Sequence, residues 1–233
     1  MKDLNDLETR VAVPSGGVSL EGDLVLPEGA QGIVLFAHGS GSSRHSPRNR
    51  SVAAALREGN LGTLLFDLLS PDEEVIDLQT THLRFDIALL AERLIHAIDW
   101  MTRQEPELPI GLFGSSTGAG AALLAAAQRP ERVDAVVSRG GRPDLARSAL
   151  RQVEAPTLLI VGQRDTPVIE LNRLAMEELR CKKKLEIVSR ATHLFEEPGA
   201  IEEVSRLARN WFNAYLGAAS PRERPAMRIS EGL

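Results

Sequence analysis

Short apolar runs alternate with longer segments of helical periodicity along almost the whole chain. The run from Ile33 to Ala37 is continuously apolar, as in strands buried on both faces. The segment from Leu83 to Met101 instead repeats its apolar residues every three or four positions, as one side of a helix does. This alternation predicts an α/β fold with a mostly parallel central sheet and helices on both faces. We expect strands at 9–13, 18–26, 33–37, 61–69, 110–113, 133–137, 157–161 and 185–188, and helices at 51–58, 83–101, 118–128, 168–180 and 200–216.

The connections between these segments add two expectations. Only residues 14–17 separate the first two strands, which predicts an antiparallel hairpin at the N-terminal end. The strand before Asp165 begins soon after Val137, so the interval leaves no room for a large lid domain. We expect one domain over residues 1–217. A flexible tail is expected over 218–233, because that stretch is polar and rich in Arg and Pro.

Composition excludes several classes of partner. The 233-residue chain has a formal net charge of -5, so it lacks the basic surface that nucleic acid requires. No stretch approaches the roughly 20 apolar residues needed to cross a bilayer. The single cysteine, Cys181, excludes an intramolecular disulfide and a zinc site built on several thiolates. With no signal-peptide pattern at the start, we expect a cytoplasmic protein that holds no metal and no cofactor.

A Gly-x-Ser-x-Gly pattern at residues 114–118 follows a predicted strand and precedes an Ala-rich predicted helix. In this context the central serine, Ser116, lies on a sharp turn that exposes its hydroxyl to a substrate carbonyl. The flanking glycines fit, because such a strained turn tolerates only small neighbours. Ser116 is therefore the candidate nucleophile, and Ser115 is expected to point elsewhere. The alternative is a structural or phosphate-binding glycine turn.

A serine nucleophile of this kind needs an acid and a histidine that follow it along the chain, in that order. His193 is the only one of the five histidines that follows Ser116. Asp165 comes just after the strand preceding the histidine loop, and it would hold His193 in the correct tautomer. Its alternative role is to cap the next helix. Weaker candidates for the acid are Asp144, Glu196 and Glu197.

The negative charge that develops on the substrate oxygen needs two backbone N–H donors, the oxyanion hole. Thr117, which follows the nucleophile, is expected to supply one. The loop after residue 37 is expected to supply the other, with Ser40 as the candidate and Gly39 or Gly41 as alternatives. His38, in the same loop, is expected to brace it and not to transfer protons.

Basic residues near this loop are candidates for substrate binding. Arg44, His45 and Arg48 could recognise an anionic or polar group, because arginine suits carboxylates and phosphates. The alternative is that they fix the loop by hydrogen bonds to the backbone and to acids such as Asp67. Arg139, which follows another strand, either lines the same mouth or belongs to a surface loop. Gly39 and Gly41 complete the set of candidate substrate-binding residues.

These motifs together resemble the α/β-hydrolase superfamily, and within it the dienelactone-hydrolase-like group of small enzymes without a lid. The resemblance runs from Val18 to Leu216, and residues 38–49 are similar to a subgroup that occurs alone and fused to phosphoribosyltransferase domains. It implies hydrolysis of a small-molecule carboxylic ester, or a related acyl bond, through an acyl-enzyme. Dienelactone hydrolases use a cysteine nucleophile, whereas position 116 is serine and Cys181 lies far away in sequence. Generic esterase chemistry is therefore favoured over dienelactone hydrolysis.

Other functions share this pattern. A thioesterase, amidase, acyltransferase or cofactor-free haloperoxidase can use the same fold and triad. A ligand-binding protein without turnover is a second alternative. A structural partner in a larger assembly is a third, favoured only by the Arg- and Pro-rich tail. We expect a monomer or a homodimer.

Overall fold

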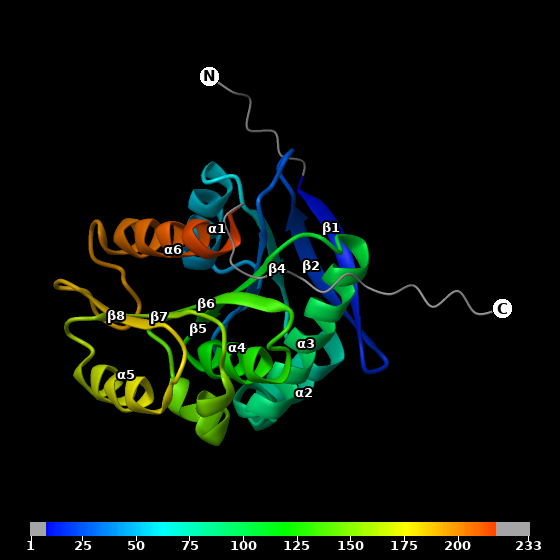
Figure 1. Ribbon diagram of the computed structural model, residues 1–233. Coiled ribbons are helices and arrows are strands. Elements are labelled where there is room, and N and C mark those ends of the chain that lie inside the picture. Colours follow the sequence, from blue (N-terminus) through cyan, green and yellow to red (C-terminus); the bar gives the residue numbers. More distant parts are fainter. Residues whose placement is uncertain (1–7, 218–233) are drawn as a thin grey trace.

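A sheet of eight strands, in the order β1-β2-β4-β3-β5-β6-β7-β8, runs through the computed structural model, which describes residues 8–217 (Figure 1). The first two strands, β1 (Thr9–Ser15) and β2 (Val18–Val25), form an antiparallel hairpin. β2 then pairs antiparallel with β4. The remaining pairs are parallel, and their strands are β3 (Ile33–Ala37), β4 (Gly62–Phe66), β5 (Ile110–Ser115), β6 (Val133–Arg139), β7 (Thr157–Gly162) and β8 (Lys183–Val188). The predicted sheet and hairpin are confirmed, although the turn is shorter than expected because residues 14 and 15 belong to β1.

Helices cover both faces of this sheet (Figure 1). One face carries α1 (Pro47–Glu58) and α6 (Ala200–Leu216), which pack on a core that includes Phe113 and Phe212. The other face carries α3 (Ile87–Gln104), α4 (Thr117–Gln128), α5 (Thr166–Glu178) and the 3-10 segment η2 (Pro143–Gln152). No helix within residues 8–217 is long and apolar enough to span a membrane.

Four predicted helices have different limits: α4 begins one residue earlier than expected, and α5 covers residues 166–178 instead of 168–180. The two larger differences, in α1 and α3, come from capping residues. α1 begins at Pro47 and not at residue 51, since the Ser46 side chain accepts a hydrogen bond from the Asn49 N–H and proline suits the first helical position. The segment predicted at 83–101 divides into the 3-10 turn η1 (Leu83–Phe85) and α3. Asp86 separates the two, because its side chain caps α3 by accepting from the Leu89 N–H.

The helix α2 (Pro71–Thr80) was absent from the prediction. It begins with a capping box, in which the Ser70 and Glu73 side chains each bind the other's backbone N–H. Its single buried residue is Asp77, whereas Val75, Ile76 and Leu78 are exposed. A helix without a buried apolar stripe gives no periodic signal in the sequence.

The connection between β6 and β7 contains only the short segment η2, so residues 8–217 include no large lid domain, as predicted. The carboxyl ends of β5, β6 and β7 and the loop after β8 meet at one edge of the sheet, which in α/β folds is the edge that carries ligand sites. The tail predicted over 218–233 lies outside the described residues.

Candidate active site

Ser116 occupies a strained turn between β5 and α4. Its backbone angles, φ 50° and ψ -121°, lie in a region that residues with a side chain rarely adopt. Two bonds to the loop after β6 hold it there: the Ser116 N–H donates to the Arg139 carbonyl at 3.2 Å, and the Arg142 N–H donates to the Ser116 carbonyl at 3.0 Å. Such strain is characteristic of residues that the fold holds in place for function.

The two glycines of the turn are required by close backbone contacts. A Cβ on Gly114 would lie 2.4 Å from the Cα of Ala119, and one on Gly118 would lie 2.3 Å from the carbonyl oxygen of Ala37. α4 therefore starts in direct contact with the end of β3. Ser115 points away from this edge, as predicted, because its buried hydroxyl donates to Asn49 Oδ1 at 3.0 Å.

Asp165 and His193 are in direct contact. The His193 Nδ1 and Asp165 Oδ2 atoms are 2.6 Å apart, a distance typical of a charge-assisted hydrogen bond. Asp165 lies at the N-cap position of α5, yet its side chain makes no capping hydrogen bond. The capping alternative for Asp165 is therefore wrong. With the Nδ1–H donated to the carboxylate, the Nε2 atom of His193 is left to accept a proton.

The other candidate acids have different partners. Asp144 forms two hydrogen bonds of 2.8 Å with Arg142. Glu197 accepts the Thr192 N–H, and this backbone hydrogen bond lowers the pKa of the Glu197 carboxyl. Glu196 pairs with Arg48 at 3.2 Å. Among the four acids considered, Asp165 alone contacts His193.

Gly140 contacts His193 and directly follows the residue that binds the Ser116 N–H. A Cβ on Gly140 would be 3.6 Å from His193 Cε1, and its neighbour Arg139 accepts the Ser116 N–H. Within residues 8–217 no hydrogen bond joins the Ser116 hydroxyl to His193. Catalytic hydrogen bonds are often long in unliganded sites and shorten when substrate binds.

The loop after β3 lies against the Ser116 side chain, since a Cβ on Gly39 would be 3.1 Å from Ser116 Cβ. The expected donors of the oxyanion hole, Ser40 and Thr117, contact each other: the Ser40 N–H donates to Thr117 Oγ1 at 2.9 Å. The N–H of Ser40 therefore has a partner before any substrate is bound.

A family model described as an alpha/beta hydrolase domain matches residues 30–211. The chain belongs to this family. The sequence of the hydrolase is also 62% identical to that of a dienelactone hydrolase from Anabaena variabilis. The match to its crystal structure has a TM-score of 0.88 and covers 89% of this chain and 97% of that one. It resembles Est1E from Butyrivibrio proteoclasticus in fold, with a TM-score of 0.74 at 15% identity, over 88% of this chain and 98% of that one.

One curated relative of the hydrolase is a putative phosphoribosyl transferase of Mycobacterium tuberculosis strain H37Rv. The two are 53% identical over 216 residues, which cover 92% of this chain and 48% of the relative. The chain thus spans about half the length of the curated relatives it matches. Together, the family model and the dienelactone hydrolase support a hydrolase of the dienelactone-hydrolase-like type.

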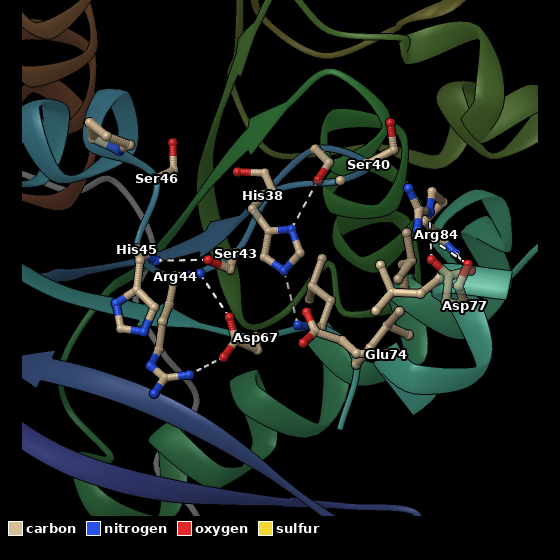
Figure 2. Close-up of a pocket in the computed structure, with 18 residues that line it drawn as sticks. His38, Ser40, Ser43, Arg44, His45, Ser46, Asp67, Glu74, Asp77 and Arg84 are labelled. Atoms are coloured by element: carbon tan, nitrogen blue, oxygen red, sulfur yellow. Dashed lines mark hydrogen bonds and ion pairs between the residues drawn. The ribbon is translucent and has the colours of Figure 1, made fainter. Parts of the chain in front are cut away.

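His38 braces the loop of the hydrolase, as predicted. Its Nδ1 lies 3.0 Å from the Gly39 carbonyl, and its Nε2 accepts the Leu68 N–H at 3.1 Å (Figure 2). Because Nε2 is an acceptor, the proton must be on Nδ1. Burial lowers the pKa of His38 and so favours this neutral form. Both ring nitrogens of His38 are thus occupied by contacts within the protein.

Arg44 also makes structural contacts in the hydrolase. Its backbone N–H donates to Asp67 Oδ1 at 2.8 Å, and its guanidinium contacts Asp67 Oδ2 (Figure 2). The guanidinium also contacts Glu21 at 2.5 Å. These contacts fit the alternative in which Arg44 fixes the loop and does not bind substrate. His45 is more loosely held, with its Nδ1 atom 3.5 Å from an Arg50 nitrogen.

Arg48 and Arg139 are the remaining basic candidates for substrate binding. Arg48 is in the first turn of α1, and its charge helps to lower the pKa of Arg139. Arg139 is the last residue of β6 and is 8% exposed, so the surface-loop alternative is wrong for this residue.

A cavity of about 680 Å³ borders the loop after β3 (Figure 2). Gly39, Ser40 and Gly41 are among its lining residues, whereas Ser116 and His193 are not. The opposite wall comes from α2 and η1, where Asp77 binds Arg84 at 2.5 Å. The cavity is thus adjacent to the expected oxyanion hole and next to the helix that the sequence did not predict.

Proposed function

We propose that this hydrolase cleaves carboxylic esters of small molecules through an acyl-enzyme on Ser116. The observation that carries the proposal is the Asp165–His193 hydrogen bond of 2.6 Å, together with a serine in a strained strand-to-helix turn whose N–H binds the residue before Gly140, the glycine that contacts His193. A nucleophile, a base and a group that orients the base are the three parts that acyl transfer to serine needs.

The reaction proceeds in two halves. Ser116 Oγ attacks the acyl carbon while its proton passes to His193 Nε2, and the carbonyl electron pair moves onto the oxygen. The N–H groups of Thr117 and of the 39–41 loop stabilise that oxyanion. When the tetrahedral intermediate collapses, the C–O bond to the alcohol breaks and His193 protonates the departing oxygen.

Water completes the cycle. It attacks the acyl carbon while His193 accepts one of its protons, and the proton then returns to Ser116 Oγ as the acid leaves. Asp165 keeps the Nδ1–H of His193 in place and stabilises the imidazolium in both halves. The steps balance without a metal or an organic cofactor. The phosphoribosyl transferase name belongs to relatives about twice as long, and we do not propose that activity for this chain.

The test is the Ser116→Ala variant, assayed with 4-nitrophenyl acetate and butyrate. We expect kcat to fall by at least about a thousandfold, as for other serine nucleophiles. Ser51→Ala, on the exposed side of α1, is the matched control and should retain wild-type turnover. Turnover by Ser116→Ala near the wild-type rate would refute the proposal.

A fluorophosphonate probe separates an enzyme from a binding protein of the same fold. Labelling should modify the peptide that contains residues 114–118, and tandem mass spectrometry should assign the adduct to Ser116 and not to Ser115. An unlabelled wild-type protein would favour the binding protein. Faster cleavage of a matched thioester or amide than of the ester would assign the triad to that substrate instead.

A further inference from the structure

Residues 139–142, at the end of β6 and just before η2, contact both the Ser116 turn and His193. The Arg139 carbonyl accepts the Ser116 N–H at 3.2 Å, and the Arg142 N–H donates to the Ser116 carbonyl at 3.0 Å. A Cβ on Gly140 would lie 3.2 Å from the His193 carbonyl oxygen and 3.6 Å from His193 Cε1. No hydrogen bond joins the Ser116 hydroxyl to His193 within residues 8–217. The placement of the proposed nucleophile relative to the proposed base therefore depends on how this segment is held.

The peptide group between Gly141 and Arg142 is hydrogen-bonded through both its N–H and its oxygen. Its N–H, from Arg142, donates to the Ser116 carbonyl at 3.0 Å. Its oxygen, from Gly141, accepts a hydrogen bond of 3.0 Å from Asn172 Nδ2. Because a peptide group is planar and nearly rigid, the bond from Asn172 fixes the direction in which this N–H points toward the turn. Asn172 is therefore linked to Ser116 through a single rigid group.

The Asn172 side chain is itself fixed on α5. Its Nδ2 also donates to the Val168 carbonyl at 2.7 Å, four residues earlier on the helix, so both N–H donors of the amide are used. Asn172 is 0% exposed, so solvent does not compete for these two bonds. α5 begins directly after Asp165, the candidate acid. The same amide thus connects the helix that follows Asp165 with the peptide that holds Ser116.

Gly141 is closely packed on the side of the nucleophile turn. A Cβ on Gly141 would lie 1.9 Å from Ser138 Oγ, on β6, and 2.5 Å from the Cβ of Ala119, on α4. α4 is the helix that begins directly after Ser116. Close-packed groups transmit a displacement to their neighbours and do not absorb it. A change in the way Gly141 is held should therefore reach the Ser116 turn.

Core packing alone does not explain an asparagine at position 172. The other buried residues of α5 are apolar, namely Val168, Ile169 and Ala175. The Oδ1 atom of Asn172 is buried and accepts no hydrogen bond from residues 8–217. A buried acceptor without a donor costs free energy, which an apolar side chain at this position would avoid. The hydrogen bond from Nδ2 to Gly141 is the contact that an apolar side chain could not replace.

We propose that Asn172 is a positioning residue for the hydrolysis. It orients the peptide between Gly141 and Arg142, and this peptide holds Ser116 where its hydroxyl can give a proton to His193. Asn172 acts through the backbone and not on the substrate. The inference rests on the proposed function. A misplacement of about 1 Å at reacting atoms can slow a reaction by about a hundredfold, so a loss of this order sets the expected effect.

The first test is Asn172→Leu, assayed with 4-nitrophenyl butyrate at a temperature well below its melting temperature. We expect kcat to fall by about tenfold to a hundredfold, because Ser116 is no longer held in place. KM should stay within about threefold of wild type, since the change does not alter a group that binds the ester. The rate of labelling by a fluorophosphonate should fall in parallel, because it also requires Ser116 to be placed near His193.

The matched control is Ser205→Ala on α6. Ser205 is also buried, and its hydroxyl donates to the Ile201 carbonyl at 2.8 Å, four residues earlier on the helix, as Asn172 does to Val168. α6 lies on the opposite face of the sheet from α5 (Figure 1). Ser205→Ala should therefore lose a similar bond within a helix and keep the wild-type kcat.

The second variant, Asn172→Asp, keeps the shape of the side chain. Its carboxyl can donate to the Gly141 carbonyl only when it is protonated, and burial favours that form. The kcat of Asn172→Asp relative to wild type should therefore rise as pH is lowered from about 8 to about 6. The same ratio for Asn172→Leu should not depend on pH, because leucine cannot donate at any pH.

A purely structural role would lower the melting temperature of Asn172→Leu and leave the kcat of the folded protein at the wild-type value, and that result would overturn the proposal. If Asn172→Leu does not fold, Asn172→Asp decides, because a relative kcat that does not change with pH would also overturn it. Wild-type turnover by Ser116→Ala would overturn both this proposal and the proposed function. Loss of turnover in Ser116→Ala, together with wild-type kcat in Asn172→Leu, would overturn the role of Asn172 alone.

Discussion

Replacing Asp165 by asparagine removes one charge from the candidate site while keeping the size of the side chain. The Asp165 side chain is 12% exposed, and its Oδ2 lies 2.6 Å from His193 Nδ1. An asparagine carbonyl oxygen can accept the same hydrogen bond, so the orientation of the imidazole ring can be retained. In the proposed mechanism, the variant loses the attraction between the carboxylate and the imidazolium that forms when Ser116 gives up its proton.

The strength of this attraction follows from the distance between the two charges. The charge centres in such a pair are about 4 Å apart, and at an effective dielectric constant of about 20 their attraction is about 4 kcal/mol. The His193 side chain is 39% exposed. Solvent screening therefore removes part of the attraction and leaves about 2–4 kcal/mol. Since 1.36 kcal/mol corresponds to a factor of ten, kcat/KM should fall by about 30- to 1000-fold.

The assay compares Asp165→Asn with Asp144→Asn on 4-nitrophenyl butyrate, with melting temperatures measured for both. Asp144→Asn is the same chemical change at another acid, which pairs with Arg142 and not with His193. It should stay within about twofold of wild type, as expected for a charge outside the site. If folded Asp165→Asn kept kcat/KM within threefold of wild type, or if Asp144→Asn lost as much, the assignment of the acid would be refuted.

Two further predictions concern the loop after β3. If Ser40 is an oxyanion donor, its N–H must leave Thr117 Oγ1 when the ester binds. Thr117→Val removes this competing acceptor, so kcat/KM should rise by about two- to tenfold. Thr117→Ser keeps the hydroxyl and should resemble wild type. A lower kcat in Thr117→Val would instead make the hydroxyl itself a donor to the oxyanion. For His38, burial lowers the folded-state pKa, so the unfolded chain binds the proton first as pH falls below about 6.5. The free energy of unfolding should therefore decrease in that range, by at most about 1.4 kcal/mol per pH unit. Urea titrations at several pH values measure this free energy, and its dependence on pH should be weaker in His38→Gln.

The strands and the core helices were predictable because burial leaves a pattern in the sequence. β3 and α6 have the limits that were expected, since the first is continuously apolar and the second carries a clear apolar stripe. α2 was not predictable by periodicity, because its single buried residue is Asp77. Its capping box, Ser70 with Glu73, was the available signal.

The candidate site was predictable to the extent that chain order constrains it. The order serine, acid, histidine selected the pair Asp165 and His193, which the structure joins by a hydrogen bond. Contacts between distant segments leave no such trace. The Ser40–Thr117 bond spans 77 positions and the Asn49–Ser115 bond spans 66, and each depends on how β3, α1 and β5 are packed.

Because α1 starts earlier than expected, Arg48 and Asn49 lie in a helix and not in a loop. Both were expected in a loop, where an arginine side chain moves freely and a bound anion must first order it, at a cost of about 2 kcal/mol. Because Ser46 caps the helix and Pro47 begins it, both residues belong to the first turn of α1. Asn49 then ties this turn to Ser115, the residue before the proposed nucleophile. The backbone of Arg48 is thus fixed relative to Ser116, so the ordering cost expected for an arginine in a free loop is reduced.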